Sequence, residues 1–267
     1  VISVSRIFVM YSKGGASARR IAAILALPEE LLPEAERAPQ DDSVIRFENV
    51  TFSYGEVPAL RGVDFSLAKG QSLGIIGATG SGKSTVVALL LRFYDACEGR
   101  VLVDGKDVRA YERAELREKF GVVFQNDFLM AASVRENIGF IGEHGGFESE
   151  LTARGANFSG GQKQRLLIAR ALASSPEILI LDDSSSALDY RTDAQLRKTL
   201  LERLPDTTIV MIAQRISSVR FADRILVLDE GRAVGFGSDS ELMETCEVYR
   251  RIYASQHDAD KGGSQNA

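Results

Sequence analysis

The chain has 267 residues, 45% of them hydrophobic and 26% charged, with a formal net charge of −5. This length allows one large or two small globular domains, and the composition provides enough apolar residues for a core. The acidic balance, with a pI near 5.3, excludes a protein that binds nucleic acid mainly by electrostatic attraction. The two cysteines, Cys97 and Cys246, lie far apart without a CxxC spacing, which predicts reduced intracellular thiols.

The first 43 residues are predicted to form a helix and a linker. Residues 1–27 have the periodicity of an amphipathic helix that is interrupted at Gly14-Gly15. Residues 28–43 are acidic and contain prolines at intervals, which is typical of a linker. No run of about 18 uninterrupted apolar residues occurs, so no transmembrane helix is predicted. The start also lacks the features of a signal peptide, and the missing initial methionine suggests a fragment of a longer chain.

Short apolar runs alternate with helical patterns from Val44 onward. The segment 45–54 alternates in hydrophobicity as a half-buried strand does, and 72–76 is continuously apolar as a buried strand is. Further strands are predicted at 120–124, 178–181, 207–212 and 224–229. Strands separated by helices imply an α/β fold with a mostly parallel sheet. This domain is expected to span residues 44–255, and the polar, glycine-containing segment 256–267 is expected to be a disordered tail.

A phosphate-binding loop is predicted between the strand at 72–76 and a following helix. The segment from Gly77 to Ser84, here called the phosphate loop, has the pattern G-x-x-x-x-G-K-S. Both flanks fit this motif, which leaves a chance glycine-rich turn as a weak alternative. The glycines let main-chain N–H groups and the helix N-terminus point at phosphate oxygens. Lys83 brings a positive charge to the β- and γ-phosphates, and the Ser84 hydroxyl can ligate Mg²⁺. The candidate nucleotide-binding residues are Gly77, Ala78, Thr79, Gly80, Ser81, Gly82, Lys83, Ser84 and Thr85.

Asp182 ends the apolar strand at 178–181. A carboxylate there fits the second Mg²⁺ anchor of phosphate-loop enzymes, and an exposed acidic turn is the alternative. The location of Asp182, about a hundred residues after an intact phosphate loop, favours the metal site. A phosphate loop alone is compatible with kinases, GTPases, helicases and transport ATPases.

A second anion-binding helix end is predicted between these two motifs. Ser159, Gly160 and Gly161 open a helical run that continues to Leu172, so a hydroxyl and bare N–H groups lie at its start. Two such helix ends in one chain suggest a dimer in which each of them faces the partner's nucleotide.

With these motifs in this order, the sequence resembles the nucleotide-binding domain of an ATP-binding-cassette (ABC) transporter of the exporter type over roughly residues 44–254. The resemblance implies a P-loop NTPase (ABC ATPase) fold with a mostly parallel sheet core, an antiparallel β subdomain and a helical subdomain. It implies ATP and Mg²⁺ as ligands. It also implies that Gln125 contacts Mg²⁺ with Ser84 and Asp182, and that Tyr54 stacks on adenine; core packing is the alternative for Tyr54.

The resemblance further implies that part of this chain completes a partner's ATP site. The family signature, usually Leu-Ser-Gly-Gly-Gln, is present with one change at Phe158, Ser159, Gly160, Gly161 and Gln162. The family's D-loop corresponds to Ser186, Ala187, Leu188 and Asp189. The implied partners are the chain's own transmembrane domain and a second ABC half-transporter, and no nucleic acid. Residues 16–21 resemble the cytoplasmic end of an exporter's last transmembrane helix, so residues 1–27 are expected to be that helix end. The implied location is therefore the cytoplasmic face of a cell membrane.

Two departures from the family pattern affect the catalytic residues, which would be Lys83, Asp183 and Gln214. Asp183 replaces a glutamate and is shorter by about 1.5 Å, and a misplacement of about 1 Å can cost roughly a hundredfold in rate. Gln214 replaces a histidine; it can donate a hydrogen bond but cannot carry a proton near neutral pH. Harmless drift is the alternative. The pattern predicts slow hydrolysis at this chain's own site, as in one half of a heterodimeric ABC multidrug exporter.

The third departure is a short helical subdomain. Few residues separate the segment 133–138 from the signature at 158–162, where exporters have a longer stretch. The abrupt join near Phe140-Ile141 favours an engineered or omitted stretch over a natural deletion.

Three other functions stay open at this stage. The chain could be an ATP-binding regulatory module without useful hydrolysis, an active homodimeric exporter, or a soluble ABC ATPase of DNA repair or translation. The last lacks support, because the chain has no coiled-coil insertion and no second cassette. The sequence does not indicate what is transported.

Overall fold

The computed structural model describes residues 2–26, 43–125, 127–139, 158–182 and 190–263, in two compact units that divide between Pro33 and Glu34. The first unit contains helix α1 (Ile2–Leu25). The predicted interruption at Gly14-Gly15 is wrong, because α1 is continuous. A glycine costs about 1 kcal/mol in a helix interior, and the flanking helix formers offset this. Within the described ranges, no helix combines the length and the hydropathy that a membrane crossing requires.

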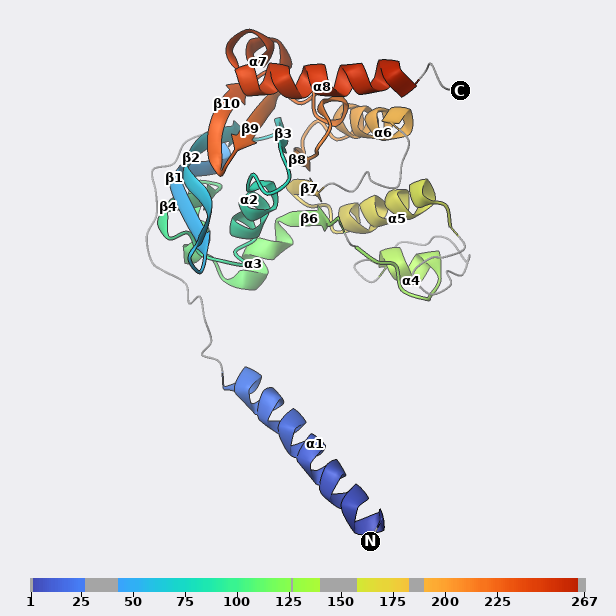
Figure 1. Ribbon diagram of the computed structural model, residues 1–267. Coiled ribbons are helices and arrows are strands. Elements are labelled where there is room, and N and C mark those ends of the chain that lie inside the picture. The colour runs from blue at the N-terminus through green and yellow to red at the C-terminus, as the bar shows by residue number, and fades with distance from the viewer. Residues whose placement is uncertain (1, 27–42, 126, 140–157, 183–189, 264–267) are drawn as a thin grey trace. The chain divides into compact units, whose positions relative to one another are not determined.

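The second unit is built on the predicted mostly parallel sheet, which has six strands in the order β10-β9-β3-β8-β7-β6 (Figure 1). Strands β6, β7, β8, β3 and β9 are parallel, and β10 pairs antiparallel with β9. The strands are β3 (Ser72–Gly77), β6 (Phe120–Val123), β7 (Ile178–Asp182), β8 (Thr208–Ile212), β9 (Arg224–Asp229) and β10 (Arg232–Gly237). Every residue of β3, β7 and β8 is buried, as expected of central parallel strands.

A four-stranded antiparallel sheet, β2-β1-β4-β5, forms the expected second layer. Its strands are β1 (Ser43–Tyr54), β2 (Val57–Ala68), β4 (Glu98–Val103) and β5 (Lys106–Asp107). One hydrophobic core lies between this sheet, helix α2 and one face of the parallel sheet. Successive strand residues such as Ile75 and Ile76 point to opposite faces of the parallel sheet. The second face of this sheet therefore has its own core, which it forms with α5 and α8.

Helices connect and cover these strands (Figure 1). They are α2 (Lys83–Leu90), η1 (Val108–Ala110), α3 (Arg113–Glu118), α4 (Val134–Gly139), α5 (Gly160–Leu172), α6 (Tyr190–Arg203), η3 (Ile216–Ser218), α7 (Asp239–Thr245) and α8 (Glu247–Gly263). Helices α4 and α5 pack on each other where the helical subdomain is expected, and the short segment around Phe140-Ile141 lies outside the described residues.

The C-terminal segment differs from its prediction. A disordered tail from Gln256 is wrong for residues 256–263, because α8 continues through them. The cause is tertiary: Tyr249, in the first turn of this helix, is fully buried, and the Gln256 side chain bonds to the main chain of another segment. These anchors outweigh the polar composition, which was the basis of the prediction.

Candidate nucleotide-binding site

The phosphate loop is shaped by close contacts that exclude side chains. Gly82 has φ +101°, a left-handed conformation that favours glycine. A Cβ there would lie 2.6 Å from Leu60 Cδ2 and 2.7 Å from the carbonyl oxygen of Ala59. At Gly77, a Cβ would overlap the carbonyl oxygen of Leu228. The loop therefore lies directly against the β1–β2 hairpin and the end of β9.

Lys83 is held inside this loop. Its Nζ donates hydrogen bonds to the carbonyl oxygens of Gly77, at 2.8 Å, and Ala78, at 2.7 Å, and the side chain is buried. Helix α2 begins at Lys83, so its N-terminal N–H groups open toward the loop. The arrangement concentrates positive charge and N–H donors at one place, which is what a phosphate group requires.

The loop also contains a buried polar atom that is suited to a ligand. Ser81 Oγ is buried and has no hydrogen-bond partner within the described part of the chain. Leaving such a hydroxyl unpaired costs about 1–3 kcal/mol. A phosphate oxygen in the loop would accept from it, so the residues present fit a bound nucleotide phosphate.

A cavity of about 380 Å³ joins this loop to side chains from distant parts of the sequence. Its volume lies within the usual range of small-molecule sites, roughly 300–1,000 Å³. The lining residues are Tyr54, Val57, Pro58, Ala59, Thr79, Gly80, Gly82, Lys83, Ser84, Thr85, Gln125, Asp182, Ile212 and Gln214.

The polar side chains meet because parallel strands end at one edge of the sheet. The loops after β3, β6 and β8 bring the phosphate loop, Gln125 and Gln214 to this edge, and Asp182 is the last residue of β7. In the register of β7 and β8, Asp182 lies opposite Ile212, two residues before Gln214. Ligands of open α/β sheets bind at such carboxyl ends.

Three oxygen-bearing side chains in the cavity could hold Mg²⁺. Ser84, Gln125 and Asp182 all line it, and hydroxyl, amide and carboxylate oxygens are the ligands that this ion prefers. Asp182 is buried. The predicted catalytic residue Asp183 and the predicted D-loop, 186–189, lie outside the described residues.

At the other end of the cavity stands an aromatic wall. Tyr54 is 42% exposed, an exposure that core packing does not explain, and its hydroxyl lies 3.5 Å from Thr85 Oγ1. The ring of Tyr54 meets the ring of Phe52 edge to face at 4.8 Å and the ring of Tyr94 at 5.1 Å. An exposed tyrosine face beside a phosphate loop suits a stacked base.

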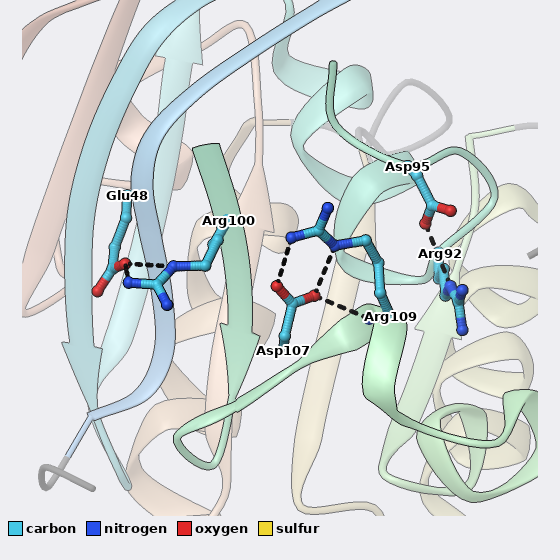
Figure 2. A network of polar contacts seen from close by, with 6 residues as sticks. All are labelled: Glu48, Arg92, Asp95, Arg100, Asp107 and Arg109. Atoms are coloured by element: carbon cyan, nitrogen blue, oxygen red, sulfur yellow. Dashed lines mark hydrogen bonds and ion pairs between the residues drawn. The ribbon is translucent and has the colours of Figure 1, made fainter. Parts of the chain in front are cut away.

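Tyr94 was not predicted from the sequence, although the run Phe93-Tyr94 directly after α2 marks an aromatic turn. The segment is fixed by the buried Arg92, whose Nε donates to Asp95 Oδ1 at 3.1 Å and whose Nη1 donates to the carbonyl oxygen of Tyr111 at 3.2 Å. Figure 2 shows Arg92 with its Asp95 partner beside two further pairs, Asp107–Arg109 and Glu48–Arg100.

The signature residues form the N-terminus of α5 and do not line the cavity. Ser159 Oγ accepts from the N–H of Gln162 at 3.3 Å, and Gln162 Oε1 accepts from the N–H of Ser159 at 2.8 Å. This reciprocal capping box fixes the helix end. Phe158 packs on a small cluster with Leu129 and Val134. The exposed Ser159 thus lies outside the cavity that the phosphate loop lines.

Comparisons with known proteins agree with this geometry. A family model described as ABC transporter matches residues 60–186. An uncharacterized ABC transporter ATP-binding protein of Mycobacterium bovis is 35% identical over 96% of this chain and 49% of its own length. The ATP-dependent lipid A-core flippase of Xanthomonas oryzae is 36% identical, covering 92% and 46%. A putative multidrug export ATP-binding/permease protein of Bacillus subtilis is 34% identical, covering 84% and 43%.

A solved structure has the same fold. A bacterial Atm1-family ABC exporter with ATP bound superimposes with a TM-score of 0.81 at 30% identity, over 92% of this chain and 48% of that chain. The present chain therefore spans about half the length of the curated relatives and of the solved structure that it matches.

Proposed function

The chain contains an ABC transporter ATP-binding domain, similar to those of exporters, and on this premise we propose that it binds Mg-ATP and couples its binding and hydrolysis to export across a membrane. The observation that carries the proposal is the cavity in which Tyr54, Lys83, Asp182 and Gln214 meet. Domains of this family are ATPases coupled to transport. The named relatives include a lipid flippase and a multidrug export protein, so we assign no cargo.

In this proposal each part of the cavity has one role. Tyr54 binds the base, and the phosphate loop binds the phosphates through its N–H groups and the Lys83 ammonium. Ser84, Gln125 and Asp182 would hold Mg²⁺, which neutralises phosphate charge when it is bound. Gln214 lies at the carboxyl end of β8, where it can donate a hydrogen bond to the terminal phosphate but cannot exchange a proton with it.

We further propose that this chain's own site hydrolyses ATP slowly. Asp183 would place its carboxylate short of the attacking water, and Gln214 would replace the imidazole that the resemblance implies. The signature at 158–162 is well formed and lies outside the chain's own cavity. This supports a second ABC half-transporter as the partner, whose ATP site the signature completes. A transmembrane domain would correspond to the half of the relatives that the match does not cover.

The test is steady-state Mg-ATP hydrolysis at high protein concentration. The parent is compared with the double variant Asp183→Glu/Gln214→His, and Lys83→Ala in each background gives the rate that does not depend on the cavity. We expect a nearly idle parent and a gain of about tenfold or more, since the variant moves the acid by about one methylene. A parent that already hydrolyses briskly would favour a symmetric homodimeric exporter. A double variant that binds ATP without any gain would favour a regulatory module.

A further inference from the structure

The side chain of Gln256, on helix α8, forms two hydrogen bonds with the loop that contains Gln214. Its Oε1 accepts a hydrogen bond from the main-chain N–H of Ile216 at 2.9 Å. Its Nε2 donates to the main-chain carbonyl oxygen of Gln214 at 2.7 Å. One amide group thus uses both its acceptor and its donor on residues that are 40 and 42 positions away in the sequence.

The same loop is also held by a hydrogen bond to the central sheet. Directly before Gln214, the N–H of Ala213 donates to the carbonyl oxygen of Ile75 on β3 at 3.1 Å. Two residues after it, Ile216 opens the short helix η3, and the residue at its N-cap, Arg215, makes no side-chain capping bond. The Oε1 of Gln256 supplies that missing acceptor from another helix. Gln214 is therefore held between the central sheet on one side and α8 on the other.

Helix α8 is itself fixed firmly enough to serve as an anchor. Tyr249 is fully buried, and its hydroxyl donates to Asp239 Oδ1 at 2.6 Å. Burial, and then the hydrogen bond to Asp239, raises the pKa of Tyr249 far above its usual value, so this donor is present at every physiological pH. Further along α8, Ile252 and Tyr253 pack on the cluster that contains Ile216. Because α8 is well packed, its hydrogen bonds to the loop can fix the position of the loop.

We propose that Gln256 is a positioning residue for the terminal-phosphate end of the cavity: through two main-chain hydrogen bonds it sets where Gln214 points, and so how well the domain distinguishes ATP from ADP. The proposal rests on the proposed function, because it requires that the cavity bind a nucleotide. Only ATP has a third phosphate for Gln214 to contact. A loss of positioning therefore lowers affinity for ATP selectively, whereas a general loss of structure lowers affinity for both nucleotides.

The experiment compares two variants of Gln256 with one control variant of its neighbour, Ser255. Gln256→Met preserves the length of the side chain and removes both hydrogen bonds. Gln256→Glu keeps the acceptor for Ile216 but cannot donate to Gln214. Ser255→Ala is the matched control, since within the described part of the chain the Ser255 hydroxyl donates to the Ile252 carbonyl of its own helix and to no residue of the Gln214 loop. Affinities for Mg-ATP and Mg-ADP are measured by equilibrium titration, and hydrogen exchange is followed in the peptide that contains Ile216.

We expect Gln256→Met to weaken ATP binding by about three- to tenfold, the effect of one or two hydrogen bonds, with ADP binding changed less than about twofold. Hydrogen exchange of the Ile216 amide should become faster in Gln256→Met. Gln256→Glu should have an intermediate ATP affinity and an intermediate exchange rate, and Ser255→Ala should match the parent in both. Equal weakening for both nucleotides, or unchanged ATP binding with unchanged exchange, overturns the positioning role alone. A parent that binds neither nucleotide overturns the proposed function itself and this inference with it.

Discussion

The ring of Tyr94 meets the ring of Tyr54 edge to face, with centroids 5.1 Å apart and planes at 90°. Such aromatic pairs contribute about 0.5–1.5 kcal/mol beyond the area they bury. Because Tyr54 lines the cavity, this contact helps to fix the surface on which a base would stack. We expect Tyr94→Ala to weaken Mg-ATP binding by about two- to tenfold, and Tyr94→Phe to retain the parent's affinity.

A fluorescent ATP analogue, titrated into each variant, measures this effect. Phe221→Ala is the control, because Phe221 is also exposed but lines a separate surface pocket with Leu201 and Leu204. If Tyr94→Ala and Phe221→Ala bind the analogue equally well, the aromatic wall has no role in nucleotide binding.

Replacing Lys83 with alanine should nearly abolish Mg-ATP binding. The ammonium is the charge that the phosphate loop encloses, and its removal also deletes the two hydrogen bonds that it donates to the carbonyl oxygens of Gly77 and Ala78. The free energy of unfolding should therefore fall as well, by about 1–3 kcal/mol. Calorimetric titration and urea unfolding measure the two effects, with the exposed Lys69→Ala as the control. Unchanged affinity in Lys83→Ala would refute the assignment of the phosphate loop.

The capping box at Ser159 predicts a defect that acts in trans. In the Asp183→Glu/Gln214→His background, chains with Lys83→Ala and chains with Ser159→Ala should each be inactive alone. Mixing them should restore hydrolysis, because one site of each mixed pair combines an intact Lys83 with an intact signature. If the signature served its own chain's site, the mixture would stay as inactive as its components.

The second capping box in the chain controls for stability in that experiment. Ser238 caps α7 by the same reciprocal bonds with Glu241 that Ser159 makes with Gln162. Loss of either cap should lower the free energy of unfolding by about 1 kcal/mol. Only Ser159→Ala should affect hydrolysis, and an equal loss of activity in Ser238→Ala would show that the defect is merely structural.

The capping box of Ser238 and Glu241 also predicts how the free energy of unfolding depends on pH. Hydrogen bonds from the Ser238 main-chain N–H and the Ser238 side chain lower the pKa of Glu241, because they favour its ionised form. A lowered folded-state pKa contributes stability above the unfolded-state pKa of about 4.3 and loses it as the pH falls through the folded-state value. Urea unfolding between about pH 3 and pH 6 should show a shallower acid loss for Glu241→Gln. Glu244→Gln, on the same helix, is the control; if it flattens the profile equally, the capping box is not the cause.

Much of the sheet and the polar half of the site could be predicted, because their signals are local. The runs at 178–181 and 224–229 form β7 and β9, since continuous apolar stretches bounded by polar residues favour buried strands. Asp182 could be assigned to the phosphate loop's neighbourhood because it ends a predicted strand, whereas Gln125 was assigned only from the resemblance to the family. Strand order was not predicted, since nothing local to β3 indicates that β8 and β9 flank it.

The remaining features depend on contacts between distant segments. Tyr94 and Gln256 belong to a helix end and a polar segment, and only the folded chain brings them to Tyr54 and Gln214. The break predicted in α1 failed for the opposite reason: Gly14-Gly15 is a local signal, but helix propensity is a sum over the whole segment. The role predicted for Asp183 stays a prediction, because Asp183 lies outside the described residues.

The tight contact between Gly82 and the hairpin residues Ala59 and Leu60 has a kinetic consequence. It packs the hairpin that follows Tyr54 directly against the phosphate loop, so the proposed base surface and the proposed phosphate surface form one packed unit. A ligand therefore has no flexible segment to order at this junction, and the usual entropic cost of induced fit is small there. Nucleotide capture by this half of the site should proceed at a rate governed by diffusion and orientation. A single methyl group at Gly82 would push the two surfaces out of alignment together.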